Sequence, residues 1–220
     1  MTSHPKYKLN PKRKDGLRRI VYKINIPMYH IKAGDLGGLL EGYHNLSQED
    51  NCCVCGNAIV RGDAIVGGDA IVCCYARVGD NAVVGGNAIV CDSATVRDNA
   101  HVSGRSVVRG SARVRGSASV SGNAWVCNSV IIESGEWSIT PLYIELYPWS
   151  LITDTPTTIK IGCQSHTPEW WLSKESKILL LTHEVDSRKS AEYEIAIKFA
   201  AKWLKHNAKF IKDNSSDTVL

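Results

Sequence analysis

The sequence of 220 residues contains no long apolar run and no recognisable export signal. No stretch approaches the roughly 20 apolar residues of a membrane-spanning helix, so no membrane contact is expected. The N-terminus lacks the basic and then apolar pattern of a secretory signal peptide. These absences predict a cytoplasmic protein, and 44% hydrophobic residues are enough to form a core.

The missing export signal also decides how the eight cysteines are interpreted. In a secreted chain they would suggest disulfides, whereas reduced thiols are expected in the cytoplasm. The cysteines are Cys52, Cys53, Cys55, Cys73, Cys74, Cys91, Cys127 and Cys163.

Acidic residues are scarce at the N-terminus. Residues 1–23 contain eight lysines and arginines but one acid, Asp15, whereas the rest of the chain is slightly acidic. Such a basic arm is either a solvated tail or a contact for nucleic acid or another polyanion, and the pattern leaves both open.

The middle of the chain repeats every six residues. A small residue, alanine except at Ser106, stands two positions before each repeated β-branched residue from Val60 to Val126. Turn formers such as Gly62-Asp63 connect the hexads. The fourteen β-branched positions are Val54, Val60, Val66, Val72, Val78, Val84, Val90, Val96, Val102, Val108, Val114, Val120, Val126 and Ile132.

Each hexad predicts a very short strand followed by a corner. Because all corners are alike, three strands and three corners close a triangular coil, with valine and alanine pointing inward. Fourteen hexads give about 4.7 coils and, at strand spacing, a prism roughly 22 Å tall. The predicted fold class is mainly β, with a small α+β C-terminal region.

The hexads resemble the hexapeptide-repeat family, whose members form a left-handed parallel β-helix and include many acyltransferases. The segments 30–38, 45–48 and 159–167 are similar to parts of a set of phage and bacterial proteins of unassigned function, often labelled acetyltransferase-like. The resemblance implies a homotrimer and, for a phage-encoded chain, action in the host cytoplasm. A fold does not by itself give a function.

Residues 18 apart are expected to stack on one outer face, which sorts the outward residues into three faces. The first, here the cysteine face, is apolar apart from Arg109, so a flanking segment or a neighbouring subunit is expected to cover it. Its thiols form a line rather than the tetrahedron that zinc requires, so no metal is expected. The predicted subunit interface consists of Ile71, Cys73, Ile89, Cys91, Val107 and Trp125.

The second, here the arginine face, carries a column of arginines with few acids nearby. The planar guanidinium offers a fork of donors that suits phosphate. The face is therefore either a solvated surface or a site for an anion such as a nucleotide, the phosphates of coenzyme A, or nucleic acid. The predicted ligand-binding residues are Arg61, Arg77, Arg97, Arg113 and Arg115.

The third, here the histidine face, contains His101, the one histidine in the hexads. The resemblance implies a histidine general base and a coenzyme A lying along the prism, and a base needs a pKa near neutrality. The hexads contain no long looped insertion of the kind that shapes an acceptor pocket. His101 is therefore a catalytic candidate only if the chain is an acyltransferase. His166, near Cys163, is better explained as a neighbour of a helix cap at Thr167.

The pattern divides the chain into a basic arm and cap at 1–48, the repeat at 49–134 and an α+β region at 135–220. Aromatic residues of the last region are expected in its core, although Trp170 and Trp171 alternatively form a stacking surface. The tail 214–220 is expected to fray. Strands are expected at 17–26, 142–146, 149–153 and 157–162, and helices at 168–174 and 187–207, the latter with an apolar stripe of Ile195, Ala196, Phe199, Ala200 and Trp203.

Three functions remain open from the sequence. The favoured one is a non-enzymatic oligomeric binding protein without a cofactor, which holds a nucleotide-like anion or a host protein partner beside the arginine face. One alternative is a coenzyme-A-dependent acyltransferase that uses His101 as base. The other is a structural assembly module whose basic arm meets nucleic acid.

Overall fold

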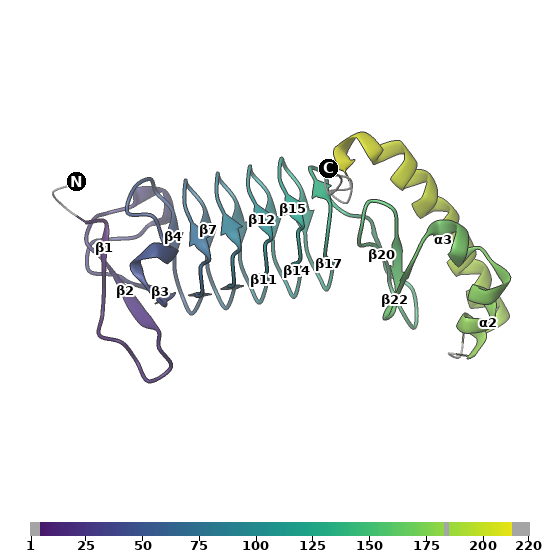
Figure 1. The fold of residues 1–220 in the computed structure, drawn as a ribbon, viewed down its shortest axis with the longest axis horizontal. Helices are drawn as coiled ribbons and strands as arrows, with labels where there is room; N and C mark the ends of the chain where they lie inside the picture. Colours follow the sequence, from purple (N-terminus) through teal and green to yellow (C-terminus); the bar gives the residue numbers. More distant parts are fainter. Residues whose placement is uncertain (1–4, 183–184, 213–220) are drawn as a thin grey trace, which may run out of the picture.

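The computed structural model describes residues 5–182 and 185–212 as an elongated parallel β-solenoid that carries a small α+β region at its C-terminal end (Figure 1). The mainly β class predicted from the hexads is confirmed, while the left-handed sense of the coil stays a prediction. The predicted frayed tail lies outside the described residues. None of the described helices combines the length and apolarity needed to cross a membrane.

Each hexad forms a two-residue strand, and strands one coil apart pair in parallel to build three flat sheets. Under the cysteine face lie β4 (Cys53–Val54), β7 (Ile71–Val72), β10 (Ile89–Val90), β13 (Val107–Val108) and β16 (Trp125–Val126). Under the arginine face lie β5 (Ile59–Val60), β8 (Arg77–Val78), β11 (Thr95–Val96), β14 (Arg113–Val114) and β17 (Ile131–Ile132). Under the histidine face lie β6 (Ile65–Val66), β9 (Val83–Val84), β12 (His101–Val102), β15 (Ser119–Val120) and β18 (Glu136–Trp137).

The hexad residues fill the interior as the pattern predicts. The repeated valines from Val54 to Val126, together with Ile132, are at most 1% exposed, and the alanines two positions earlier are fully buried. At the one serine among them, the buried Ser106 hydroxyl donates to the carbonyl of Ser103 at 2.7 Å. The polar exception therefore leaves no unpaired group in the core.

The corners place one residue per hexad at a positive φ, which favours glycine. One corner column is all glycine because a Cβ on Gly104 would lie 2.7 Å from the backbone nitrogen of Gly122. Another column tolerates aspartate, and there the side chain adds a hydrogen bond between coils. Asp80 accepts from the backbone N–H of Asp98 at 3.2 Å, and Asp98 accepts from that of Gly116 at 2.9 Å.

The solenoid extends past both ends of the hexad run. Before it, β3 (Leu36–Leu40) pairs Leu40 with Val60, twenty residues on, and Leu46 forms a bridge with Val66. After it, β18 pairs Val120 with Trp137, seventeen residues on. Larger buried side chains, Leu40 and Trp137, thus close the two ends where the spacing departs from eighteen.

The basic arm is not a solvated tail in the described part of the chain. β1 (Tyr7–Leu9) and β2 (Arg18–Tyr22) form an antiparallel hairpin that continues the arginine-face sheet through β3. Lys6 is 2% exposed, and its Nζ donates to the carbonyl oxygens of Glu49 and Cys52. Several of the basic residues therefore hold the cap together, while the hairpin loop keeps others exposed.

The C-terminal region confirms the predicted α+β character. An antiparallel sheet packs against helices, and the chain then returns to the solenoid, where β23 (Ile211–Lys212) pairs with β18. The sheet strands are β19 (Tyr143–Ile144), β20 (Leu151–Thr153), β21 (Ile159–Ile161) and β22 (Gln164–His166). The helices are α1 (Pro168–Trp171), α2 (Lys174–Thr182) and α3 (Ser187–Asn207), and short 3-10 turns occur at Pro27–Tyr29, Tyr43–Asn45 and Ala208–Phe210.

The predicted apolar stripe of α3 is wrong in part. Ala196 and Ala200 are buried, but Ile195 is 70% exposed and Phe199 is 55% exposed. The buried face instead contains Tyr193, Ala196, Ile197, Ala200 and Leu204. Two faces of this helix are apolar, and the face that contains Tyr193 is the buried one. The Tyr193 hydroxyl donates to the carbonyl of Trp149 at 2.6 Å, which holds this face against the region beside β20.

The aromatic core of this region was also predicted only in part. Trp137 and Trp171 are buried, whereas Tyr147 is 77% exposed. Trp170 and Trp171 do not form a joint stacking surface, because the Trp171 indole N–H donates to the carbonyl of Ile159 inside the core. The ring of Trp170 is covered by His166, with centroids 3.6 Å apart.

The register predicts how two neighbouring substitutions differ. Val90→Asp places an unpaired carboxylate in the core, which costs several kcal/mol, so we expect the protein not to fold. Ile59→Thr lies on the outer side of its strand, so we expect a loss below about 1 kcal/mol. Urea unfolding followed by circular dichroism measures both, and equal destabilisation would show that inside and outside are misassigned.

Candidate functional site

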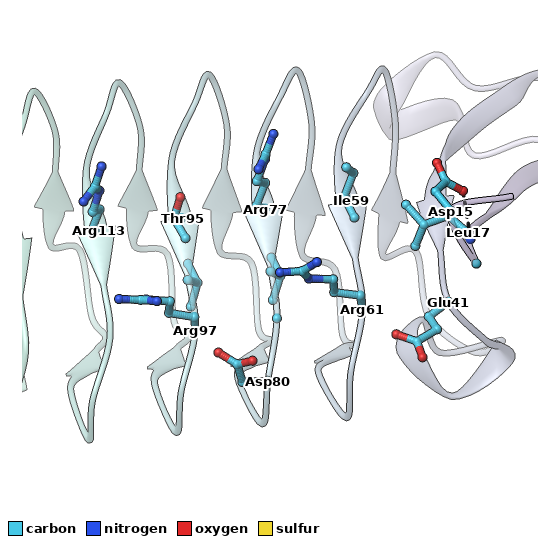
Figure 2. Close-up of a pocket in the computed structure, with 14 residues that line it drawn as sticks. Asp15, Leu17, Glu41, Ile59, Arg61, Arg77, Asp80, Thr95, Arg97 and Arg113 are labelled. Atoms are coloured by element: carbon cyan, nitrogen blue, oxygen red, sulfur yellow. Dashed lines mark hydrogen bonds between the residues drawn. The ribbon is translucent and has the colours of Figure 1, made fainter. Parts of the chain in front are cut away.

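A groove of about 700 Å³ runs along the arginine face (Figure 2). Four of the five predicted arginines line it, each from a different coil: Arg61, Arg77, Arg97 and Arg113. The N-terminal hairpin forms one end of the groove through Asp15, Gly16 and Leu17. Residues of both the repeat and the N-terminal cap therefore form the groove, although the sequence pattern places these two parts in separate segments.

The four arginines alternate between two columns, and small residues fill the intervening positions. Arg77 and Arg113 precede the inward valines of β8 and β14, with Thr95 between them. Arg61 and Arg97 follow the inward valines of β5 and β11, with Gly79 on the coil between them. The side chain of Arg61 lies over Gly79, since a Cβ on Gly79 would be in van der Waals contact with its Cγ at 3.8 Å.

Arg61, Arg77, Arg97 and Arg113 are exposed, and none of them forms an ion pair with a described residue. Arg115 differs, because its guanidinium is paired with the carboxylate of Glu133 one coil on, and it does not line the groove. Arg115 therefore lies outside the groove that the other four arginines line, and its place in a ligand site stays a prediction. Its charge is already neutralised by a partner that the column spacing places beside it.

Three acids also line the groove, and each has a local partner. Asp15 accepts from the backbone N–H of Leu17 and pairs with Arg13. Glu41 accepts from the backbone N–H of Gly62, and Asp80 accepts from that of Asp98. Sequence reasoning missed Asp15, Leu17 and Glu41, since no repeat relates the hairpin to the hexads. Asp80, in contrast, is the corner residue that comes after β8, so the hexad pattern already places it near the arginines.

His101 lies on a different side of the prism. It is exposed on β12, where its register neighbours are Val83 and Ser119. The arginines project from another of the three sheets, so a single chain does not bring them together with the histidine. His166 is in the C-terminal region, where its ring stacks on that of Trp170. As predicted, Thr167 caps α1, because its side chain accepts a hydrogen bond from the backbone N–H of Trp170.

The cysteine face is partly buried and apolar apart from Arg109. Ile71, Ile89 and Val107 are half-buried in successive coils, and Trp125 is 47% exposed beneath the guanidinium of Arg109. The thiols of Cys55 and Cys91, both on this face, have a raised pKa. Hydrogen bonding with Cys53 raises the pKa of Cys55 to about 12, and burial, with Asp92 nearby, raises the pKa of Cys91 to about 11.

The remaining chemistry of the described chain is sparse. Within residues 5–182 and 185–212, no three histidine, cysteine or acidic side chains cluster as a metal site requires. A second cavity, of about 260 Å³, lies in the C-terminal region and has a mainly apolar lining. Cys163 lies beside it and is exposed.

No protein-family model matches this chain. No curated protein matches it either. The interpretation of the groove therefore depends on its own residues and their geometry.

The cysteine face predicts slow thiol chemistry. At pH 8 a thiol with a pKa of about 11 is ionised to roughly one part in a thousand, and the thiolate is the nucleophile. We expect iodoacetamide to alkylate Cys91 at least about 100-fold more slowly than free cysteine, with a rate that climbs as pH rises from 8 to 10. Peptide mass mapping measures this, with exposed Cys163 as the accessibility control, and fast labelling of Cys91 at pH 8 would contradict it.

Proposed function

We propose that this chain is a non-enzymatic binding protein that holds a phosphate-bearing, nucleotide-like anion on its arginine face. The observation that supports this is the set of four exposed arginines that share one groove and have no described carboxylate partner. Guanidinium groups donate well-directed, charge-assisted hydrogen bonds to phosphate oxygens. The acids in the groove accept hydrogen bonds from the backbone or pair with Arg13, and a carboxylate cannot donate to phosphate, so the arginines are the groups that can bind an anion.

A binding protein accounts for the geometry better than an acyltransferase does. A general base has to reach the acceptor while coenzyme A occupies the phosphate site. Within one chain His101 and the arginine groove lie on different faces. Anion binding needs the groove alone, whereas catalysis also needs His101 of a neighbouring subunit to reach that groove in the homotrimer proposed below.

The proposal predicts which substitutions matter. Removing Arg77 and Arg97 together should weaken nucleotide binding by roughly 2–4 kcal/mol, taking about 1–2 kcal/mol for each charged hydrogen bond. Arg115→Ala is the matched control, because that guanidinium is already paired with Glu133 and should change the affinity little. Calorimetric titration with coenzyme A and a panel of mono- and cyclic nucleotides measures this, and the difference should shrink at high salt.

The same titrations, with an acyl-transfer assay, separate the rival functions. His101→Ala should leave anion binding unchanged, because the imidazole is not in the groove. If the chain were an acyltransferase, the same variant would lose on the order of 100-fold or more in rate. Acyl transfer that disappears with His101 would overturn the proposal. A wild-type protein that binds no anion would also do so and would leave the structural module as the remaining candidate.

We also propose that the cysteine face is a subunit interface of a homotrimer. Its outward residues are apolar over successive coils, and a surface of this kind is rarely left in water. The guanidinium of Arg109, the one charged group among these outward residues, lies over the Trp125 ring, 5.2 Å from its centroid.

The interface proposal predicts that Ile89→Asp breaks the oligomer, because an unpaired carboxylate buried between subunits costs several kcal/mol. Light scattering on the wild-type and variant proteins measures the mass of each. Ile65→Asp is the matched control, since Ile65 is an outward residue on the histidine face and is 48% exposed. A wild-type monomer would show that the cysteine face is not an interface.

A further inference from the structure

The four groove arginines stand in a row rather than around one point. Arg61, Arg77, Arg97 and Arg113 belong to four successive coils, so at roughly 4.8 Å per coil the row is about 14 Å long. In Figure 2, Arg61 and Arg97 point the same way along the prism, and Arg77 and Arg113 point the same way across it. Guanidinium groups that lie parallel to one another do not converge on a single compact anion.

The row has a defined beginning and end. At the hairpin end the side chain of the exposed Lys12 lies close to the lining residue Gly16, since a Cβ on Gly16 would be 3.7 Å from its Cε. Lys12 therefore adds a further positive charge beside the groove. At the other end the next guanidinium, that of Arg115, is paired with Glu133. An anionic chain is therefore favoured over a stretch of about four coils and not beyond it.

The lining contains no aromatic side chain among the described residues. Apart from charged groups it consists of Gly16, Leu17, Ile59, Val78, Gly79, Thr95 and Val96. Proteins that bind bases of single strands commonly stack them on aromatic rings, each worth about 1–3 kcal/mol. Without such rings, the groove has the means to recognise phosphates but not the means to distinguish bases.

The acids restrict the path of a ligand. In Figure 2 the carboxylates of Glu41 and Asp80 lie along one edge of the groove, while Arg77 and Arg113 project toward the opposite edge. Like charges repel across such short distances, so a chain of phosphates is directed toward the second edge. The groove thus runs along the prism axis between the two arginine columns, with Asp15 at its hairpin end.

From these observations we propose that the groove binds a linear chain of phosphates, with about one phosphate for each coil. The chemistry is shared by the backbone of a single-stranded nucleic acid and by inorganic polyphosphate. A nucleic acid strand carries one phosphate per roughly 3.4 Å in a duplex and a longer interval when extended, which can match the coil rise. This inference rests on the proposed function and specifies its ligand class.

The test is a calorimetric length series with 5′-phosphorylated oligothymidylates of one, two, four and eight nucleotides, and with linear polyphosphate. We expect affinity to rise about tenfold for each added phosphate up to four, as one charge-assisted contact is added per coil, and to change little from four to eight. For the tetramer, the plot of log K against log salt should have a slope near −3, about 0.7 for each phosphate contacted. Oligoadenylate of the same length should bind equally well.

Three variants locate the binding. Arg97→Ala should weaken the tetramer about tenfold and reduce the salt slope by about 0.7. Arg105→Ala removes the same charge from a corner outside the groove and should do neither. Asp80→Asn should tighten binding a few-fold, because it removes a repulsive charge while the amide oxygen still accepts from the Asp98 N–H.

The outcomes separate this inference from the proposed function. Thymidine monophosphate that binds as tightly as the tetramer would overturn the linear-chain inference and leave the anion-binding function in place. If none of the oligonucleotides binds at low salt and polyphosphate does not bind either, both the linear-chain inference and the anion-binding function are overturned. Tetramer binding that Arg97→Ala and Arg105→Ala weaken equally would place the ligand outside the groove and also overturn the inference. Length-dependent binding of oligothymidylate, polyphosphate or both supports it and identifies which source the groove accepts.

Discussion

The structure depends on the parallel backbone ladder that stacks one coil on the next. The N–H of Ile71 donates to the carbonyl of Ala88, and the N–H of Arg77 donates to that of Ala94, each at 2.9 Å. This pairing repeats through the hexads, so each residue lies directly beneath the residue eighteen positions later. A solenoid of two-residue strands has few other ways to fix its register, because each strand alone contributes very little.

The ladder separates the duties of neighbouring residues. Inward valine and alanine fill the core, and the corners supply the positive φ, so the outward positions carry almost no folding requirement. Ile59, Arg77, Thr95 and Arg113 occupy equivalent places on the arginine face with equal backbone pairing. The residue type at such an outward position therefore depends on what contacts that face, and not on a need of the fold. This is why the contrast between the apolar cysteine face and the charged arginine face is informative.

The structural features that follow the six-residue repeat could be predicted from the sequence, whereas few of the features that interrupt the repeat could be. The buried valines, the stacking of outward residues and the presence of a helix at Ser187–Asn207 followed from residue spacing, although the buried face of that helix was predicted only in part. The Trp137 step of seventeen residues and the hairpin wall of the groove did not, because they depend on packing between segments distant in sequence. On α3, two apolar stripes fit the same helical period, and only contact with Trp149 selects the one that contains Tyr193. The eighteen-residue spacing places Glu133 beside Arg115, but only the structure shows that the two side chains form an ion pair.

The electrostatics of the arginine row favour an external anion over a purely structural role. Arginines of one column are two coils, roughly 9.6 Å, apart and repel one another by about 0.4 kcal/mol per pair even in water. The fold can relieve such repulsion internally, because Arg115, on the same coil as Arg113, is paired with Glu133 one coil on. Glu133 is the residue eighteen positions after Arg115, but the corresponding positions after Arg61 and Arg97 are Gly79 and Arg115. Arg61, Arg77, Arg97 and Arg113 thus stay without an ion pair among the described residues. Their backbone is already ordered by the solenoid, so an anion that binds there has to order only the exposed side chains.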